Sequence, residues 1–130
     1  MAYEVPRLVI PLICGAVSLA AQQYHLVKLS ADNKVVICDN VVDVPIGVLQ
    51  NDPDAEGKVA EVLVLGISKV QVGAVALTYG LAIGPNATGE AITETNAMTT
   101  HYSCGRVIEG AAANAICTAM IDCLHTKRLA

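Results

Sequence analysis

Short aliphatic runs separated by turn residues dominate this chain, and they predict strands rather than helices. Runs of four to eight β-branched or aliphatic residues, bounded by Asp, Asn, Pro and Gly, are typical of an all-β protein, a small barrel or a sandwich. Two stretches with helical composition, 19–24 and 110–114, have only single-turn length. The predicted strands lie at 26–29, 35–38, 44–49 and 59–72, then at 81–83, 90–92, 104–109 and 115–123.

The strand pattern occurs twice, about 55 residues apart, with insertions that fall in loops. Self-similarity at a fixed period indicates two copies of one supersecondary unit, which bury together a face that neither could bury alone. We therefore expect quasi-repeated units at about 18–72 and 73–124 within a single β domain at 17–130. The positions expected to be equivalent include Tyr24 with Tyr79, Gly47 with Gly105 and Val62 with Cys117. The turn at 32–34 is matched with the turn at 87–89, so that Lys34 lies over Gly89.

An apolar segment precedes the first unit. Pro6 and Pro11 remove backbone donors and favour an extended conformation, and the apolar run that follows Arg7 is too short to span a bilayer, which takes about 20 residues. We expect residues 1–16 to form an extended N-terminal arm that runs away from its own domain and adds to another chain. The predicted interface residues of this arm are Tyr3, Val5, Pro6, Arg7, Leu8, Val9, Ile10 and Leu12.

Composition argues against nucleic acid as a partner. The chain has no Phe or Trp and only four Tyr, so it has little material for stacking on bases. Its net charge is −4, and its eight basic residues are scattered apart from Lys127 and Arg128. Acidic residues gather between positions 35 and 57, where we interpret them as a solvated rim. They are Asp39, Asp43, Asp52, Asp54 and Glu56.

The chemical motifs in the chain are incomplete. The segment 52–57 imitates the start of an EF-hand loop, but Leu63 stands where the bidentate Glu belongs. The segment 84–91 copies the outer spacing of a phosphate-binding loop, but Glu90 replaces its Lys and would repel phosphate. Neither segment predicts a cofactor.

Five cysteines and three histidines leave one alternative open, a small β-barrel protein that binds a metal or another ligand. The zinc candidates are His101, Cys104, Cys117, Cys123 and His125, but the chain has no CxxC knuckle. The odd number of cysteines speaks against a complete disulfide framework. Free Cys also behaves as a small buried hydrophobe. We therefore predict reduced, structural cysteines, no bound metal, no intramolecular disulfide and no catalytic residue.

Four segments carry a resemblance to a known family: QQYHLVKL at 22–29, DVPIGVLQ at 43–50, AEVLVLGISKV at 60–70 and GRVIE at 105–109. Together they resemble the small β-rich decoration proteins, or cement proteins, of tailed-bacteriophage heads. The resemblance covers roughly residues 17–123 and includes no catalytic motif.

The resemblance implies a structural virion protein rather than an enzyme. Such a protein is made in the host cytoplasm, binds the outer surface of the head and cements neighbouring major capsid subunits, commonly as a homotrimer. The implied partners are the major capsid protein and further copies of the chain, without nucleic acid or membrane. The arm lies outside the resemblance, so its interface role rests on its apolar composition alone.

Overall fold

The computed structural model describes residues 2–15, 18–94, 100–124 and 126–128 and is all-β there, as predicted. None of this described part is a helix that is long and apolar enough to cross a membrane. The strands are β1 (Val5–Cys14), β2 (Leu26–Ala31), β3 (Lys34–Ile37), β4 (Gly47–Leu49), β5 (Val59–Gln71), β6 (Ala82–Pro85), β7 (Ala91–Thr93), β8 (Tyr102–Ser103), β9 (Gly105–Glu109), β10 (Ile116–Asp122) and β11 (Lys127–Arg128).

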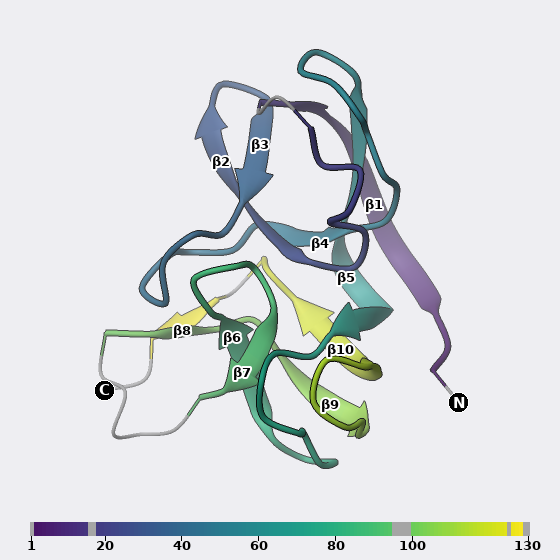
Figure 1. Cartoon of the computed structure of the whole chain (residues 1–130), viewed down its shortest axis with the longest axis vertical. Helices are drawn as coiled ribbons and strands as arrows, with labels where there is room; N and C mark the ends of the chain where they lie inside the picture. The colour runs from purple at the N-terminus through teal and green to yellow at the C-terminus, as the bar shows by residue number, and fades with distance from the viewer. Residues whose placement is uncertain (1, 16–17, 95–99, 125, 129–130) are drawn as a thin grey trace.

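Most strands belong to one sheet that closes on itself in part. The strand order is β1-β3-β2-β4-β5-β10-β9-β6-β7, while β11 pairs with β8 separately. An additional pairing of β1 with β5 closes β1, β3, β2, β4 and β5 into a ring. A parallel bridge between Val72 and Ala91 brings β5 and β7 together around a second ring. Figure 1 shows the rings one above the other, with β5 passing from the upper to the lower.

The two rings have the same connectivity. The pairings β2–β3, β2–β4 and β4–β5 recur in the second ring as β6–β7, β6–β9 and β9–β10. β1 has its counterpart in the second half of β5, because Cys14 pairs in parallel with Val35 as Val72 does with Ala91. The long strand β5 therefore completes one ring and begins the next. We call residues 5–65 unit 1 and residues 66–122 unit 2.

The strand register refines the equivalences expected from sequence. Gly47 pairs with Val27 and Gly105 pairs with Ile83, so the two glycines hold corresponding places. The expected match of Val62 with Cys117 is wrong by two residues. Val62 pairs with Leu49 on β4, and the corresponding pair on β9 and β10 is Val107 with Ala119. A register irregularity at Thr118 and Ala119 obscures this shift in the sequence.

The turns before and within each hairpin also correspond. The turn residue with positive φ ahead of β2 is Tyr24 (φ 68), and ahead of β6 it is Gly80 (φ 83), one residue beyond the expected Tyr79. Within the hairpins, Asn33 (φ 61) and Gly89 (φ 77) take the left-handed conformation that Asn and Gly tolerate best. The expected equivalence of the two turns agrees with the structure, but Gly89 corresponds to Asn33, one residue before the expected Lys34.

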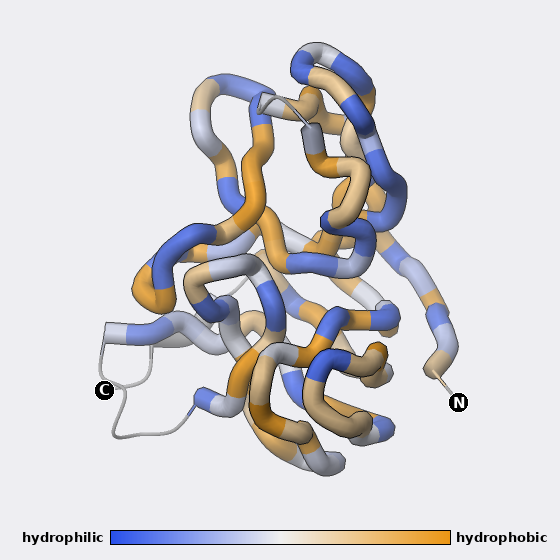
Figure 2. Tube along the Cα trace, in the orientation of Figure 1, coloured by the Kyte–Doolittle hydropathy of each residue, from blue (hydrophilic) through white to orange (hydrophobic). Residues whose placement is uncertain are grey.

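Each ring has its own hydrophobic interior. The alternation of side chains along each strand sends every second residue inward, so the same places are filled in both units. Full burial of one such Leu or Val contributes about 1.5–3 kcal/mol. Cys14, Leu19, Val27, Val35, Leu49, Ala60 and Val62 fill unit 1, and their counterparts Val72, Leu77, Ile83, Ala91, Val107, Cys117 and Ala119 fill unit 2. Figure 2 shows hydrophobic residues along the strands of both units.

The expectation of an arm that leaves its own domain is wrong. Residues 5–14 form β1, which pairs antiparallel with β5 of the same chain from Val5 opposite Ile67 to Ile13 opposite Val59. The division into an arm at 1–16 and an independent domain at 17–130 stays a prediction about folding. Prolines within an apolar run are compatible with a strand at the edge of a sheet, which is the physical reason for the error.

Candidate protein-interaction surface

Each unit carries a row of four outward-facing side chains on its four neighbouring strands. In unit 1 the first row is Cys38, Leu26, Val48 and Leu63, which are cross-strand neighbours and all completely buried. In unit 2 the second row is Glu94, Ala82, Arg106 and Met120, joined by the corresponding pairings. The first row packs into the same hydrophobic cluster as the interior of unit 2. At the end of the second row, Arg106 is exposed and Met120 is 50% exposed.

The turn between β6 and β7 contacts the first row at Leu26. The backbone N–H of Leu26 donates to the carbonyl oxygen of Gly89 at 2.7 Å. A side chain at Gly89 would collide with Ile37 and with the carbonyl of Leu26. Glycine at this place therefore satisfies both the positive φ and the close approach of unit 2 to unit 1.

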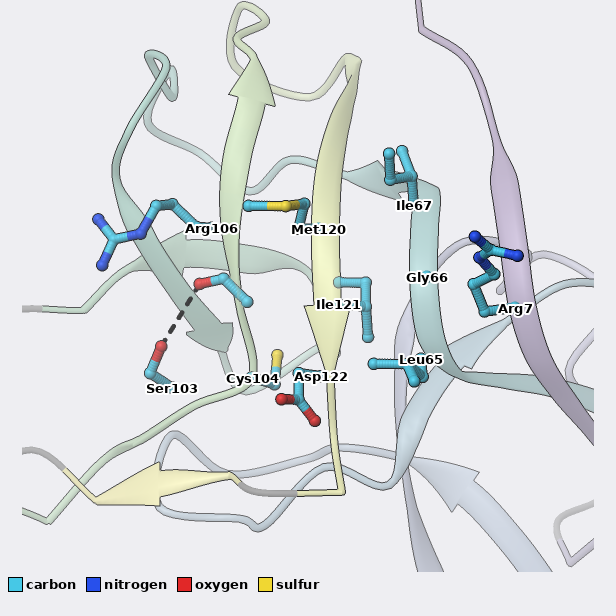
Figure 3. Close-up of a pocket in the computed structure, with 11 residues that line it drawn as sticks. Arg7, Leu65, Gly66, Ile67, Ser103, Cys104, Arg106, Met120, Ile121 and Asp122 are labelled. Carbon is cyan, nitrogen blue, oxygen red and sulfur yellow. Dashed lines mark hydrogen bonds between the residues drawn. The ribbon is translucent and has the colours of Figure 1, made fainter.

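A groove of about 590 Å³ lies beside the uncovered end of the second row. Its walls come from β1, β5, β8, β9 and β10, and Figure 3 shows Arg106 and Arg7 on opposite sides of the apolar side chains between them. Arg106 donates to the carbonyl oxygen of Gly80 at 2.6 Å. Neither arginine forms an ion pair with a carboxylate in the described part of the chain. The apolar lining residues are Leu65, Ile67, Met120 and Ile121.

The outer face of β1 is the second candidate surface. Four of its large hydrophobic side chains are exposed, together with Val59, which lies directly opposite Ile13 on β5. We call Val5, Leu8, Val9, Ile13 and Val59 the β1 strip. Ile10 and Leu12, which the sequence also placed in an interface, pack instead against the interior of unit 1. Tyr3 and Glu4 contact the same chain: the Tyr3 N–H donates to Thr118 Oγ1 at 3.0 Å, and Glu4 lies 3.7 Å from Lys69 Nζ.

The backbone edge of β1 is poorly suited to strand addition. The N–H of Cys14 donates to Lys58 on the β5 side, whereas the N–H of Ile13 donates to Asn33 on the β3 side. Backbone N–H directions alternate along a strand, so the backbone nitrogen of Pro11 lies on the same side as that of Ile13, away from β5. Because proline has no N–H, this position offers no hydrogen-bond donor at the open edge. Proline at this place protects an edge strand against pairing with another chain. The β1 strip can make contacts through its side chains, rather than through its backbone.

A buried carboxylate occupies the start of the second row. The Nδ1–H of His101 donates to Glu94 Oε2 at 2.7 Å, and Glu94 is only 4% exposed. Its Oε1 has no hydrogen-bond partner among the described residues. Burial raises the pKa of Glu94, and the hydrogen bond from His101 offsets only part of this effect. Gly84 leaves room for the carboxylate, because a side chain there would collide with it.

The zinc candidates do not converge in the described part of the chain. No group of three potential metal ligands is present there, and His125 lies outside the described residues. Cys117 points into unit 2, where burial raises its pKa to about 11. A hydrogen bond with Cys123 and burial raise the pKa of Cys104. These thiols are protonated at neutral pH, which makes them poor ligands and nucleophiles.

Part of the acidic stretch forms ion pairs with lysines that flank it. Lys28 Nζ lies 2.6 Å from Asp39 and 2.9 Å from Asp43, and Lys58 Nζ lies 2.6 Å from Asp54. Hydrogen bonding to Lys58 lowers the pKa of Asp54. These contacts hold loops of unit 1 and agree with the interpretation of an exposed acidic rim.

Sequence reasoning missed the groove because Arg106 and Met120 carry no motif. The signal that could have found them is the internal repeat: once Gly47 is aligned with Gly105, Arg106 stands where the first unit has Val48. A cationic residue at a place that is buried in the other copy indicates a surface with a different environment.

Comparison with solved structures finds the same fold in the N base of the head fiber protein gp8.5 of bacteriophage phi29. The TM-score is 0.65 at 17% sequence identity, and the match covers 89% of this chain and 96% of that chain. No family model and no curated protein matches the sequence. At this level of identity, the likeness establishes a shared fold.

Proposed function

We propose that this chain is a non-catalytic structural protein of a tailed-phage head. It binds the outer surface of the shell, contacts the major capsid protein, links neighbouring subunits and works as a homotrimer. The observation that carries the proposal is the fold shared with a head fiber base along nearly the whole length of both chains. The resemblance of the segments 22–29, 43–50, 60–70 and 105–109 to cement proteins points to the same class.

The β1 strip supplies a surface for the shell. Its apolar side chains are displayed on paired strands, so binding does not require a loop to become ordered. Association that buries preorganised side chains loses less conformational entropy than association of a flexible arm. Val59 is 56% exposed and Val9 is 40% exposed, which leaves apolar area that a partner would remove from water.

Binding to phage heads that lack the protein tests this proposal. The full chain should sediment with such heads and slow their disruption on heating. The double variant Val9→Asp and Val59→Asp should bind at least about tenfold more weakly, because two charges would be buried at the contact. Val75→Asp is the matched control, since Val75 is 71% exposed and lies in unit 2, away from the strip.

The outcomes distinguish an error in the proposed function from an error in the proposed contact surface. If the full chain does not bind heads at all, the proposed function is wrong. If it binds and the double variant binds equally well, the shell contact lies elsewhere on the molecule. Thermal unfolding of both variants must match that of the parent, which shows that any loss of binding comes from the surface rather than from the fold.

A further inference from the structure

Within the chain, unit 2 docks onto unit 1 through two elements, a row of side chains and a hairpin turn. Each element also occurs in the other unit, where it makes no such contact. The first row is the acceptor: unit 2 covers it, and the turn at 86–90 of unit 2 contacts it at Leu26. The second row repeats the acceptor in unit 2, with its Arg106 and Met120 end uncovered. The turn between β2 and β3 in unit 1 repeats the covering element, and its residues 31–33 are all exposed.

We propose that the turn at 31–33 of one copy docks beside Arg106 on unit 2 of a second copy. The inference deepens the self-association in the proposed function and does not depend on binding to the shell. A second copy is the favoured occupant because a unit of this same fold already covers the equivalent row within the chain. The apolar side chain of Met120 and the groove next to it supply the area that such a contact would bury.

The charges at the two unused sides are complementary. Asp32 lies at the tip of the turn, where unit 2 has the uncharged Thr88, and Arg106 lies in the second row, where unit 1 has Val48. Asp32 is exposed and forms no ion pair in the described part of the chain. The interface within the chain is held by covalent linkage and apolar packing. An interface between chains gains orientation and association rate from a charge pair.

The proposed contact is heterologous, because it joins the turn of one copy to the row of the next. Such contacts build a closed ring when the rotation between copies closes, and a homotrimer is a ring of this kind. The polar character of the second row suits a face that is solvated before the copies meet. The contact should therefore be reversible and weaken as salt screens the Asp32 and Arg106 charges.

A charge-exchange cycle on the full chain, without phage heads, tests the proposal by sedimentation equilibrium over a concentration series. Asp32→Lys and Arg106→Glu should each weaken self-association by at least about tenfold. The double variant Asp32→Lys with Arg106→Glu should associate within about threefold of the parent, since the pair is restored with opposite signs. Asp52→Lys is the control, because it makes the same change of charge at another exposed site.

Each outcome decides the proposal. It stands if both single variants weaken association, the double variant recovers it and the control leaves it unchanged. It is overturned if the parent is monomeric, if either single variant associates like the parent, or if the double variant stays as weak as the single ones. The midpoint of thermal unfolding, measured at a dilution where every variant is monomeric, should shift by at most a few degrees, because both side chains are exposed and Arg106→Glu loses only the hydrogen bond to Gly80. Failure here leaves binding to heads, and so the proposed function, to be decided by its own experiment.

Discussion

Unit 1 and unit 2 are built by the same strand pairings, yet they differ in what lies on their outer rows. In unit 1 the row is apolar and fully buried, whereas in unit 2 it contains Glu94 and Arg106 and is partly open. The interiors remain similar because closing each ring requires inward-facing apolar side chains at the same places. The residue types in the outer row can differ between the units, because ring closure does not constrain them and only the surface that covers the row does. We therefore expect the residues that bind partners to lie in the outer rows rather than in the hydrophobic interiors.

The largest expected effect concerns β1, which has no equivalent as a separate strand in unit 2. Deletion of residues 1–14 removes the strand that closes unit 1, together with the packing of Ile10, Leu12 and Cys14. The loss should be on the order of 5 kcal/mol or more, comparable with the total stability of a small domain. We expect no cooperative thermal unfolding transition in the remaining chain.

Deletion of residues 1–4 is the matched control for this truncation. It removes the Tyr3 to Thr118 hydrogen bond and the Glu4 to Lys69 ion pair, whose side chains are about one-third exposed. This should cost about 1 kcal/mol or less. Cooperative unfolding of the chain without residues 1–14 would show that β1 is dispensable and that 17–130 folds as the sequence alone predicted.

The second test compares the two rows directly by truncating equivalent side chains. Leu63→Ala should lower the free energy of unfolding by about 2–5 kcal/mol, because Leu63 is completely buried between the units. Met120→Ala at the corresponding place should cost less than about 1 kcal/mol, since half of that side chain is exposed. Chemical denaturation of the monomer measures both. Equal costs would mean that the rows do not differ in their cover.

These comparisons also explain how far the sequence could predict the structure. Periodicity in the aliphatic runs predicted an all-β fold, and the Asn33 and Gly89 turns could be matched because positive φ restricts the residue type. β1 was misassigned because its prolines hide its relation to residues 63–72, which cover most of β5 and the residue after it and contain no proline. The two-residue error at Val62 arose from the irregular register at β10, which spacing in the sequence does not reveal.

The sequence predicted only part of the candidate surfaces, because they combine side chains that come together only on folding. The apolar composition of residues 5–13 indicated an interaction segment, but alternation of side chains along the strand assigns Ile10 and Leu12 to the core. The groove depends on residues from five strands, which meet only in the folded chain. Glu94 and His101 likewise form no motif in the sequence, and they become a pair only when folding buries the carboxylate.

The third test concerns the two turns, which share a conformation but differ in contact. Gly89→Ala should cost about 2–3 kcal/mol, because the added methyl meets Ile37 and the Leu26 carbonyl in addition to the strain of a positive φ. Asn33→Ala has only the conformational strain and should cost about 1 kcal/mol. Thermal unfolding of both variants measures the difference. If the two costs are the same, the turn at 86–90 does not press on unit 1.

The smallest expected effect distinguishes Glu94 from Cys38, its counterpart in the first row. Because burial raises the pKa of Glu94, the unfolded chain releases this proton at a lower pH than the folded chain does. The favourable contribution is thus fully present below the unfolded pKa of about 4.3 and is lost as the pH rises through the folded pKa. The Glu94→Gln variant lacks this titration, so the stability of the parent relative to the variant should fall across that window.

Measurement of unfolding free energies from pH 4 upward checks this expectation, with Glu61→Gln as the control for loss of a charge at an exposed position on β5. The stability difference between the parent and Glu94→Gln should decline with pH, whereas the difference between the parent and Glu61→Gln should not show the same decline. A Glu94→Gln difference that rises with pH would mean that the hydrogen bond from His101 outweighs burial. In that case the ionised carboxylate of Glu94 would stabilise unit 2, whereas the corresponding place in unit 1 has the buried thiol of Cys38. The second row would then be stabilised by a charged hydrogen bond and the first row by apolar packing.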